Sequence, residues 1–200
     1  MKRTPLKAGE LQFKLAPGTY NVIEIVPNEI ITKHLKIKYD GQVFAESDVL
    51  FMTNIERYGN NSKPGMGLVK GMGLTSGALA SSVAHDSHNL MVIGTNAADM
   101  ELAANTLIEK GGGFVVVNNG KVEALVELPL AGLLSLQSAE EIKSGIEKLK
   151  VAFKKLNVKI EEPFIQMAFL ALPVIPTLKL TDRGLVDVTQ FAFIPLLCEA

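Results

Sequence analysis

The chain has few of the residues that mark disulfide-rich, membrane-spanning or secreted proteins. It contains one cysteine, Cys198, and no tryptophan in 200 residues. One cysteine excludes an intrachain disulfide and a thiolate metal cluster, and the sequence around Cys198 predicts an inert thiol. Polar residues interrupt every apolar run before the roughly 18 residues that a transmembrane helix needs, so no membrane partner is expected. The basic N-terminus lacks the apolar stretch of a signal peptide, which favours a cytoplasmic location.

An excess of charge of one sign is also missing. The chain has 20 basic and 21 acidic residues, a net charge of −1, and 6% aromatic residues. Nucleic-acid-binding proteins usually combine a basic face with stacking aromatics, so no nucleic-acid partner is expected. The hydrophobic content of 48% is enough for one buried core, and its excess indicates buried strands and a subunit or domain interface.

The motifs of hydrolytic metal centres are absent from the sequence. It has no His-x-His pair, no His-Glu-x-x-His and no cluster of carboxylates. The glycine-rich stretch GMGLVKGMGL, at 65–74, fits neither Gly-x-Gly-x-x-Gly nor a P-loop. We interpret this stretch as a turn, a strand and a turn in which the backbone approaches a neighbour closely, in preference to a phosphate site.

One helix is predicted at about 96–110 by its two ends. Asn96 is a favourable N-cap, and Asp99 places a negative charge in the first turn. The glycines at 111–113 supply a left-handed C-cap. Both ends of this helix are therefore determined by neighbouring residues.

A second helix is predicted at about 138–156. It opens with a capping box formed by Ser138 and Glu141. Its apolar residues recur at helical spacing and predict the face that packs on the core. This stripe consists of Ile142, Ile146, Leu149 and Phe153.

Runs of β-branched and aromatic residues between turn signals predict strands. The hairpin at 114–128, with Asn119-Gly120 at its tip, is the strongest of these signals. The segment at 164–176 is apolar and interrupted by prolines, and 181–184 predicts a turn. We therefore expect one α+β domain over residues 1–200, with a mixed or antiparallel sheet of at least six strands and two main helices. The other predicted strands lie at 20–27, 30–38, 49–52, 78–84 and 90–94.

The stretch SSVAHDSHNLMVIG, at 81–94, carries the candidate functional residues. Its serines, His85 and Asp86 are sequence neighbours, whereas the members of a catalytic triad converge from distant segments, so a triad is not supported. A metal site is a better fit, because imidazoles at His85 and His88 can converge in a turn with Asp86 as a further ligand. Alternatively, these polar side chains, with Ser87 and Asn89, hydrogen-bond one another and the backbone of the turn.

Several long motifs of the chain resemble the C-terminal domain of bacterial and archaeal adenine deaminases. The resemblance extends from about Thr4 to about Ile194. Its most characteristic stretch, at 69–122, is VKGMGLTSGALASSVAHDSHNLMVIGTNAADMELAANTLIEKGGGFVVVNNGKV. Further matching stretches are VIEIVPNEIITK (22–33), LPLAGLLS (128–135) and PFIQMAFLALPVIPTLKLTDRGLVDV (163–188).

The resemblance implies a domain of a larger amidohydrolase that converts adenine and water to hypoxanthine and ammonia. In that family a (β/α)8 barrel upstream binds the divalent metal, manganese or iron, and the barrel ligands have no counterpart in this chain. The implied partners are the catalytic barrel and further copies of the protein in a homo-oligomer. No cofactor is assigned to this segment itself.

The resemblance also singles out site residues. His85, Asp86, Ser87, His88 and Asn89 match the family motif residue for residue and are candidates to face the active site, with His85 and His88 as candidate metal ligands. One departure is Tyr58, in IERYGNN, where the family commonly has a histidine.

Three hypotheses follow. In the first, the chain is the C-terminal domain of an adenine-deaminase-type hydrolase, is inactive alone, packs on the barrel and supports active-site closure and oligomerisation. In the second, it is a stand-alone purine- or metal-binding module without catalysis. In the third, His85 and His88 form a small metallohydrolase site of their own.

Overall fold

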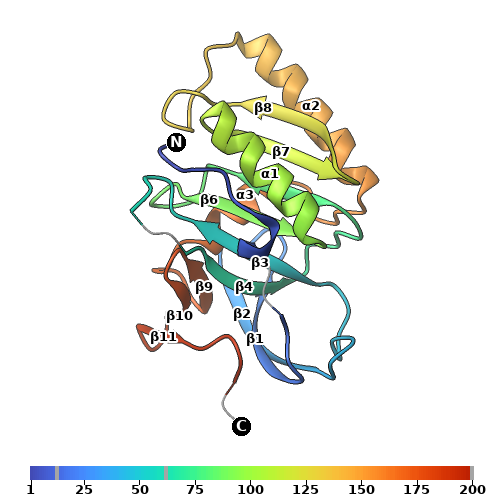
Figure 1. Cartoon of the computed structure of the whole chain (residues 1–200), viewed down its shortest axis with the longest axis vertical. Coiled ribbons are helices and arrows are strands. Elements are labelled where there is room, and N and C mark those ends of the chain that lie inside the picture. Colours follow the sequence, from blue (N-terminus) through green and yellow to red (C-terminus); the bar gives the residue numbers. More distant parts are fainter. Residues whose placement is uncertain (12–13, 61–62, 199–200) are drawn as a thin grey trace.

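A large mixed sheet forms the centre of the molecule (Figure 1). The computed structural model describes residues 1–11, 14–60 and 63–198. Within these residues the sheet has eight strands in the order β2-β1-β4-β3-β6-β5-β7-β8, and all pairs are antiparallel except β1–β4. The strands are β1 (Gly18–Ile25), β2 (Thr32–Tyr39), β3 (Val49–Ile55), β4 (Gly65–Lys70), β5 (Ala78–Ser81), β6 (Leu90–Gly94), β7 (Gly113–Asn118) and β8 (Lys121–Glu127).

Helices and a second sheet cover the two faces of the large sheet. Helix α1 (Ala97–Lys110) and the N-terminal segment, with the short 3-10 helix η1 (Ala8–Glu10), pack on one face. The other face is covered by α2 (Ala139–Lys155), α3 (Pro163–Leu170) and a small antiparallel sheet. In the described residues this small sheet contains β9 (Leu178–Thr181), β10 (Gly184–Asp187) and β11 (Ala192–Ile194). The expected α+β fold, with at least six strands and two main helices, is confirmed.

The central strands β5 and β6 are buried along their whole length. Alternate residues of a strand point to opposite faces, so Leu79 and Ile93 enter the core under α2 and α3, whereas Ala80 and Val92 enter the core under α1. A sheet covered on both faces reads as continuous apolar sequence. This double cover explains the excess of hydrophobic residues.

Helix α1 and the following hairpin form as their local sequence predicts. Asn96 caps α1 by accepting the Asp99 N–H at 2.9 Å, and Gly111 ends it in the left-handed region at φ 81°. The hairpin turns at Asn119 and Gly120, both with positive φ. Asp99 then joins the two elements, because its carboxylate accepts the N–H groups of Asn119 and Gly120 at 3.2 and 2.7 Å.

Helix α2 confirms its predicted cap but only part of its predicted stripe. Ser138 and Glu141 form the reciprocal capping box. Leu149 and Phe153 are buried, but Ile146 is 38% exposed, so its place in the apolar stripe was wrong. The contact line runs instead through Gly145, where a Cβ atom would lie 2.7 Å from Val126 Cγ2. The missing side chain brings α2 onto β8 and turns Ile146 away from the core.

Helix α3 is a third helix, in the apolar segment for which the sequence predicted no regular element. Pro163 occupies its first position, where proline's fixed φ and missing N–H carry no cost. Met167, Ala168 and Leu170 are buried against the large sheet. An apolar helix without a polar face gives no periodic signal, which is why its sequence did not reveal it.

The glycine repeat forms β4 and its flanking turns, which confirms its interpretation as a site of close backbone approach. A Cβ atom on Gly65 would lie 1.9 Å from the carbonyl oxygen of Thr181, at the end of β9. Gly71 and Gly73 have positive φ values of 103° and 79°. Glycine at 65 therefore allows the small sheet to lie directly on β4.

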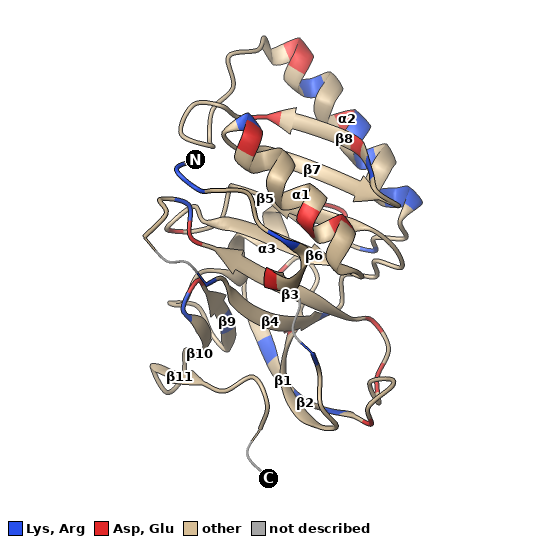
Figure 2. Cartoon of the chain, viewed as in Figure 1, with Lys and Arg blue, Asp and Glu red and all other residues tan. Residues whose placement is uncertain are grey.

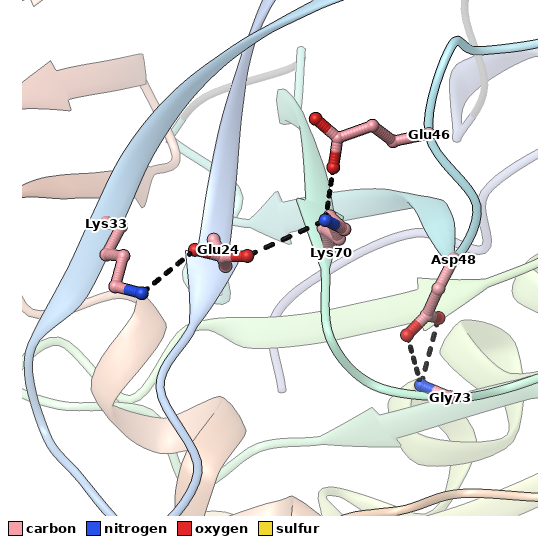
Figure 3. Close-up of polar contacts among 6 residues, drawn as sticks. All are labelled: Glu24, Lys33, Glu46, Asp48, Lys70 and Gly73. Atoms are coloured by element: carbon pink, nitrogen blue, oxygen red, sulfur yellow. Dashed lines mark hydrogen bonds and ion pairs between the residues drawn. The ribbon is translucent and has the colours of Figure 1, made fainter.

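At one end of the large sheet, Glu24 of β1 lies between two lysines on the neighbouring strands (Figure 3). Lys33 of β2 and Lys70 of β4 are its direct register partners and lie 3.5 and 3.6 Å away. Lys70 also pairs with Glu46. Cross-strand pairs of opposite charge help to fix strand register.

Helix α2 carries charges of both signs, whereas the charged residues of α1 are acidic except Lys110 at its end (Figure 2). In the part of the chain that the structure describes, no helix is long and apolar enough to cross a membrane. Lys179 of β9 is fully buried, and its Nζ donates to the Ile30 carbonyl at 2.9 Å. Burial lowers the pKa of Lys179 to about 8.

Candidate functional site

The candidate residues lie in a tight connection between β5 and β6. The turn covers His85, Asp86 and Ser87, and His88 follows with a φ of 50°. Two backbone bonds hold its ends: the His88 N–H donates to Ala84 O at 2.6 Å, and the His85 N–H donates to Ala168 O of α3 at 3.0 Å. The turn is therefore fixed to the helix that the sequence did not reveal.

A buried arginine fixes the other side of the turn. Arg57 follows β3, and its Nη1 donates to the carbonyl of His88 at 3.1 Å. Its Nη2 donates to the carbonyl of Ala131 in the loop after β8. One guanidinium thus ties together three segments that are far apart in the sequence, which a planar group with several donors is well suited to do.

The two histidine rings lie close to each other. Their centroids are 5.8 Å apart in an edge-to-face arrangement, and the ring of His85 also packs on Phe169 of α3, with centroids 5.0 Å apart. The Nδ1 atom of His88 is buried and has no hydrogen-bond partner. Burial, followed by the nearby His85 and Arg57, lowers the pKa of His88, and Asp86 opposes this effect. His88 is therefore neutral at pH 7.

The described residues do not supply a metal-ligand set. Among residues 1–11, 14–60 and 63–198, no group of three or more His, Cys, Asp or Glu side chains could hold a metal ion. Zinc, manganese and iron sites in hydrolases use at least three protein ligands. The metal role of His85 and His88 therefore stays a prediction.

The serines of the motif have structural roles. Ser82 is fully buried, and its Oγ donates to the carbonyl of Gly132 at 2.7 Å and accepts the Gly113 N–H at 2.7 Å. Ser81 bonds to Val83. Asp86 and Ser87 are exposed at the surface of the turn. The hydroxyls of Ser81 and Ser82 are therefore engaged with the backbone.

The turn borders a cavity of about 170 Å³ between β3, α3 and the β9–β10 hairpin. Asn89 is buried, and its Nδ2 lies 3.4 Å from Asp182 Oδ1 in the hairpin turn. The residues that line the cavity are Asn54, Ala84, His85, Ser87, Asn89, Ala171, Pro173, Thr181, Asp182, Arg183 and Phe193. The structure thus brings His85, Ser87 and Asn89 to one cavity, whereas Asp86 and His88 do not line it.

Sequence reasoning missed four polar residues of this site. Asn54 lies within β3, Arg57 follows that strand, and Asp182 and Arg183 form the predicted turn at 181–184. Asn54 and Arg57 were not singled out, and Asp182 and Arg183 were interpreted as a turn, because their sequence neighbours carry no functional signal. The convergence depends on the docking of the small sheet onto β3 and β4, which local sequence does not encode.

Tyr58, the departure from the family pattern, lies beside the turn. Its side chain is 58% exposed, and the Arg57 guanidinium lies 5.6 Å from its ring centroid. Arg57 also donates to the carbonyl of His88, so Tyr58 and the histidine turn contact the same guanidinium.

Comparison with known proteins identifies relatives along almost the whole chain. A sequence profile of the family described as "Adenine deaminase C-terminal domain" matches residues 29–192. The chain is 72% identical over 200 residues to the adenine deaminase of Bdellovibrio bacteriovorus. It is 48% identical over 196 residues to that of Shewanella halifaxensis, and 47% identical over 195 residues to one from Escherichia coli.

These matches cover 100%, 98% and 97% of this chain, but 34%, 33% and 33% of the respective relatives. The chain therefore spans about a third of the length of the curated relatives that it matches. The profile covers most of the chain, and the identities lie far above the level at which a shared fold alone would be inferred. The chain belongs to the family of adenine deaminase C-terminal domains.

Proposed function

We propose that this domain completes an adenine-deaminase-type hydrolase, in which the full enzyme converts adenine and water to hypoxanthine and ammonia. The domain packs on the catalytic barrel with the 85–89 turn facing the active site, supports its closure and contributes to oligomerisation. The observation that carries this proposal is the 72% identity to an adenine deaminase that is about three times as long. The remaining two thirds of such a protein have room for the barrel.

The geometry of the turn supports the same role. His85 and His88 are held rigidly, by Ala168 of α3 and by Arg57, instead of lying on a free loop. Binding surfaces act best when their side chains are positioned in advance. His88 is neutral at pH 7, and its Nδ1 is buried without a hydrogen-bond partner.

The metal of the proposed enzyme belongs to the upstream barrel. The described residues of this domain lack a ligand set, and manganese or iron remains the prediction for the barrel. The cytoplasmic location and the homo-oligomeric state likewise rest on the sequence. Under this proposal the domain contributes binding surface and shape, and no metal chemistry of its own.

A second candidate function is a stand-alone purine-binding module without catalysis. The cavity beside the turn favours it, because a buried amide oxygen of Asn54 there has no partner. Calorimetry of the chain with adenine, hypoxanthine, Mn²⁺ and Fe²⁺ tests this alternative. Binding without any dependence of deaminase activity on the domain would favour the module over the enzyme domain.

Two activity measurements test the proposed function. The 200-residue chain, incubated with adenine and added Mn²⁺ or Fe²⁺, is expected to release no ammonia above the buffer rate. Enzymatic turnover would contradict the inactivity of the isolated domain.

The second measurement uses a chimera in which this chain replaces the matching third of the Bdellovibrio bacteriovorus enzyme. We expect kcat/KM for adenine within tenfold of that relative, because 72% of the aligned residues are identical. His85→Ala with His88→Ala in the chimera is expected to lower kcat/KM at least tenfold, whereas Lys33→Ala, at an exposed pair of β2, serves as the matched control. A folded chimera without activity would overturn the proposal.

A further inference from the structure

We propose that Arg57 is a positioning residue of the deaminase reaction, which joins the 85–89 turn and the loop at 128–136 into one surface for the catalytic barrel. This inference rests on the proposed function, in which the turn faces the barrel, and it adds the residue that holds the turn in place. Arg57 is assigned no contact with substrate or metal. It acts through the two backbone carbonyls that it binds.

Arg57 is a buried cation without a carboxylate partner. It is 7% exposed, and among the residues that the structure describes no ion pair includes it. Buried arginines are almost always paired with an opposite charge. The guanidinium instead donates to two carbonyl oxygens, those of His88 and Ala131. Hydrogen bonds from a charged donor are stronger than those between neutral groups, so both carbonyls are held firmly.

The two carbonyls belong to residues with an unusual backbone conformation. His88 has a φ of 50° and Ala131 a φ of 55°, in the left-handed region that few residues other than glycine adopt. Such conformations persist where the surrounding structure imposes them, and they are concentrated at functional sites. Nη1 lies 3.1 Å from the carbonyl oxygen of His88, and Nη2 of the same planar group donates to that of Ala131. One rigid fork therefore fixes the two backbones relative to each other.

The loop packs directly on the guanidinium of Arg57. A Cβ atom on Gly132 would lie 2.8 Å from Nη2 of Arg57, so a larger residue would displace the arginine. Gly132 has a φ of 71°, and its carbonyl accepts the Ser82 hydroxyl at 2.7 Å. Backbone hydrogen bonds between Leu130 and Leu134, both of 3.1 Å, close the loop. Arg57 and Ser82 therefore fix where the loop lies.

The same loop carries exposed apolar side chains. Leu130, Leu134 and Leu136 are 44%, 64% and 76% exposed. A group of exposed leucines on one short segment is typical of a surface that another protein or domain covers. The barrel is the domain that covers it, because about two thirds of the Bdellovibrio bacteriovorus relative lie outside this chain. The polar turn and the apolar loop share one guanidinium, so they are presented to the barrel as a unit that is positioned in advance.

The test compares two variants of the chimera, with kinetics measured at low temperature where both are folded. Arg57→Met removes the charge and both donors but keeps an unbranched side chain. We expect kcat for adenine to fall about tenfold or more, with a smaller change in KM, because a displaced turn misplaces groups around the reacting centre. Asp99→Ala is the matched control. It breaks a buried cluster between α1 and the β7–β8 hairpin, so it should lower stability without changing kcat.

A second variant covers the outcome in which Arg57→Met fails to fold. Arg57→Lys keeps the charge, but an ammonium group lacks the planar fork that spans two carbonyls, so we expect a folded protein with a smaller loss of kcat. Circular dichroism confirms that each variant is folded. An unchanged kcat in folded Arg57→Met or Arg57→Lys would overturn the proposal. Equal losses of kcat in Asp99→Ala and the Arg57 variants would also overturn it, because they would reduce the effect to general stability.

Hydrogen exchange on the 200-residue chain separates this inference from the proposed function. In Arg57→Lys we expect faster exchange in peptides that cover 88–90 and 131–134, and unchanged exchange at the Asn119-Gly120 turn. Faster exchange in only one of the two segments, or in neither, would contradict the joining role of Arg57. An inactive unmodified chimera would overturn the proposed function and with it the catalytic consequence, whereas exchange decides separately whether Arg57 joins the two segments.

Discussion

Two buried polar clusters of this domain differ in how completely their atoms are paired. At the first, between α1 and the β7–β8 hairpin, the carboxylate of Asp99 accepts hydrogen bonds from Asn96 Nδ2, Asn119 N and Gly120 N. At the second, around the 85–89 turn, Asn54 Oδ1 and His88 Nδ1 are buried without partners.

This difference distinguishes buried polar groups that stabilise the fold from those at the candidate functional site. A cluster that serves stability alone satisfies its buried groups internally, as Asp99 does. The cluster at the turn instead keeps two buried atoms without partners, Asn54 Oδ1 and His88 Nδ1. A third such atom, Asn118 Oδ1, lies in the β7–β8 hairpin, so unpaired buried atoms indicate the site at the turn only together with its family motif.

The largest expected effect comes from removing the Asp99 carboxylate from the cluster between α1 and the β7–β8 hairpin, called the paired cluster below. Asp99→Ala leaves the N–H groups of Asn119 and Gly120 without their acceptor, so we expect a loss of about 4 kcal/mol in the free energy of unfolding. Urea unfolding followed by circular dichroism measures it. The kcat of the chimera for adenine, measured at low temperature where the variant is folded, should be unchanged. A loss below about 1 kcal/mol would show that the pairing contributes little.

Lys179 provides an intermediate case, a buried cation with one carbonyl partner. Its pKa falls from the ordinary 10.5 to about 8 because of burial. The unfolded chain then binds more protons between about pH 8 and 10.5, so the stability contribution of this group rises with pH across that window. At about 1.4 kcal/mol per pKa unit, the rise is on the order of 3 kcal/mol at most.

Lys179→Met isolates this contribution. At pH 8 we expect the variant to be at least as stable as the unmodified chain. As the pH rises from 8 to 10.5, the unmodified chain should gain that amount of unfolding free energy relative to the variant. Chemical unfolding at several pH values measures it. A difference that is independent of pH would contradict the burial of a charged lysine.

A smaller effect concerns His88. Because burial lowers the pKa of His88, the unfolded chain binds more protons just below pH 6.5, and the stability from this group is lost as the pH falls through the lowered pKa. NMR should show the His88 ring titrating below 6.5, with the signal identified by its absence in His88→Asn. His34, whose pKa burial also lowers, should titrate independently. A midpoint above 6.5 would reveal a partner for the ring.

The smallest effect concerns an exposed ion pair. Lys33 lies 3.5 Å from Glu24, and its side chain is 65% exposed (Figure 3). Lys33→Ala should lower the free energy of unfolding by less than about 0.5 kcal/mol, because solvent screens such pairs. Urea unfolding checks this value. A loss above 1 kcal/mol would mean that surface pairing contributes as much as a buried hydrogen bond.

The sequence predicted the paired cluster better than the unpaired one. Asn96 and Gly111 set the ends of α1, and Asn119-Gly120 set the hairpin. These signals act between residues close in sequence, so single-chain reasoning finds them. The family resemblance likewise rested on contiguous motifs and was confirmed by the comparisons.

The cavity could not be predicted, because its parts meet only through tertiary packing. Asn54 bonds to Leu180, 126 residues later in the chain. That contact requires Gly65, which lets the small sheet approach. The cavity also borders the end of α3, whose apolar sequence has no periodic signal. The 85–89 turn was identified from its sequence motif. The hydrogen bonds that hold it, from Arg57 and to the carbonyl of Ala168, join segments distant in sequence and could not be predicted.

The most direct test of the central claim, that the 85–89 turn meets the catalytic barrel, is hydrogen exchange on the chain alone and within the Bdellovibrio chimera. The account predicts slower exchange in peptides covering 85–89 in the chimera, and unchanged exchange at the Asn119-Gly120 turn. Equal exchange at 85–89 in both proteins, or protection confined to the hairpin, would contradict it.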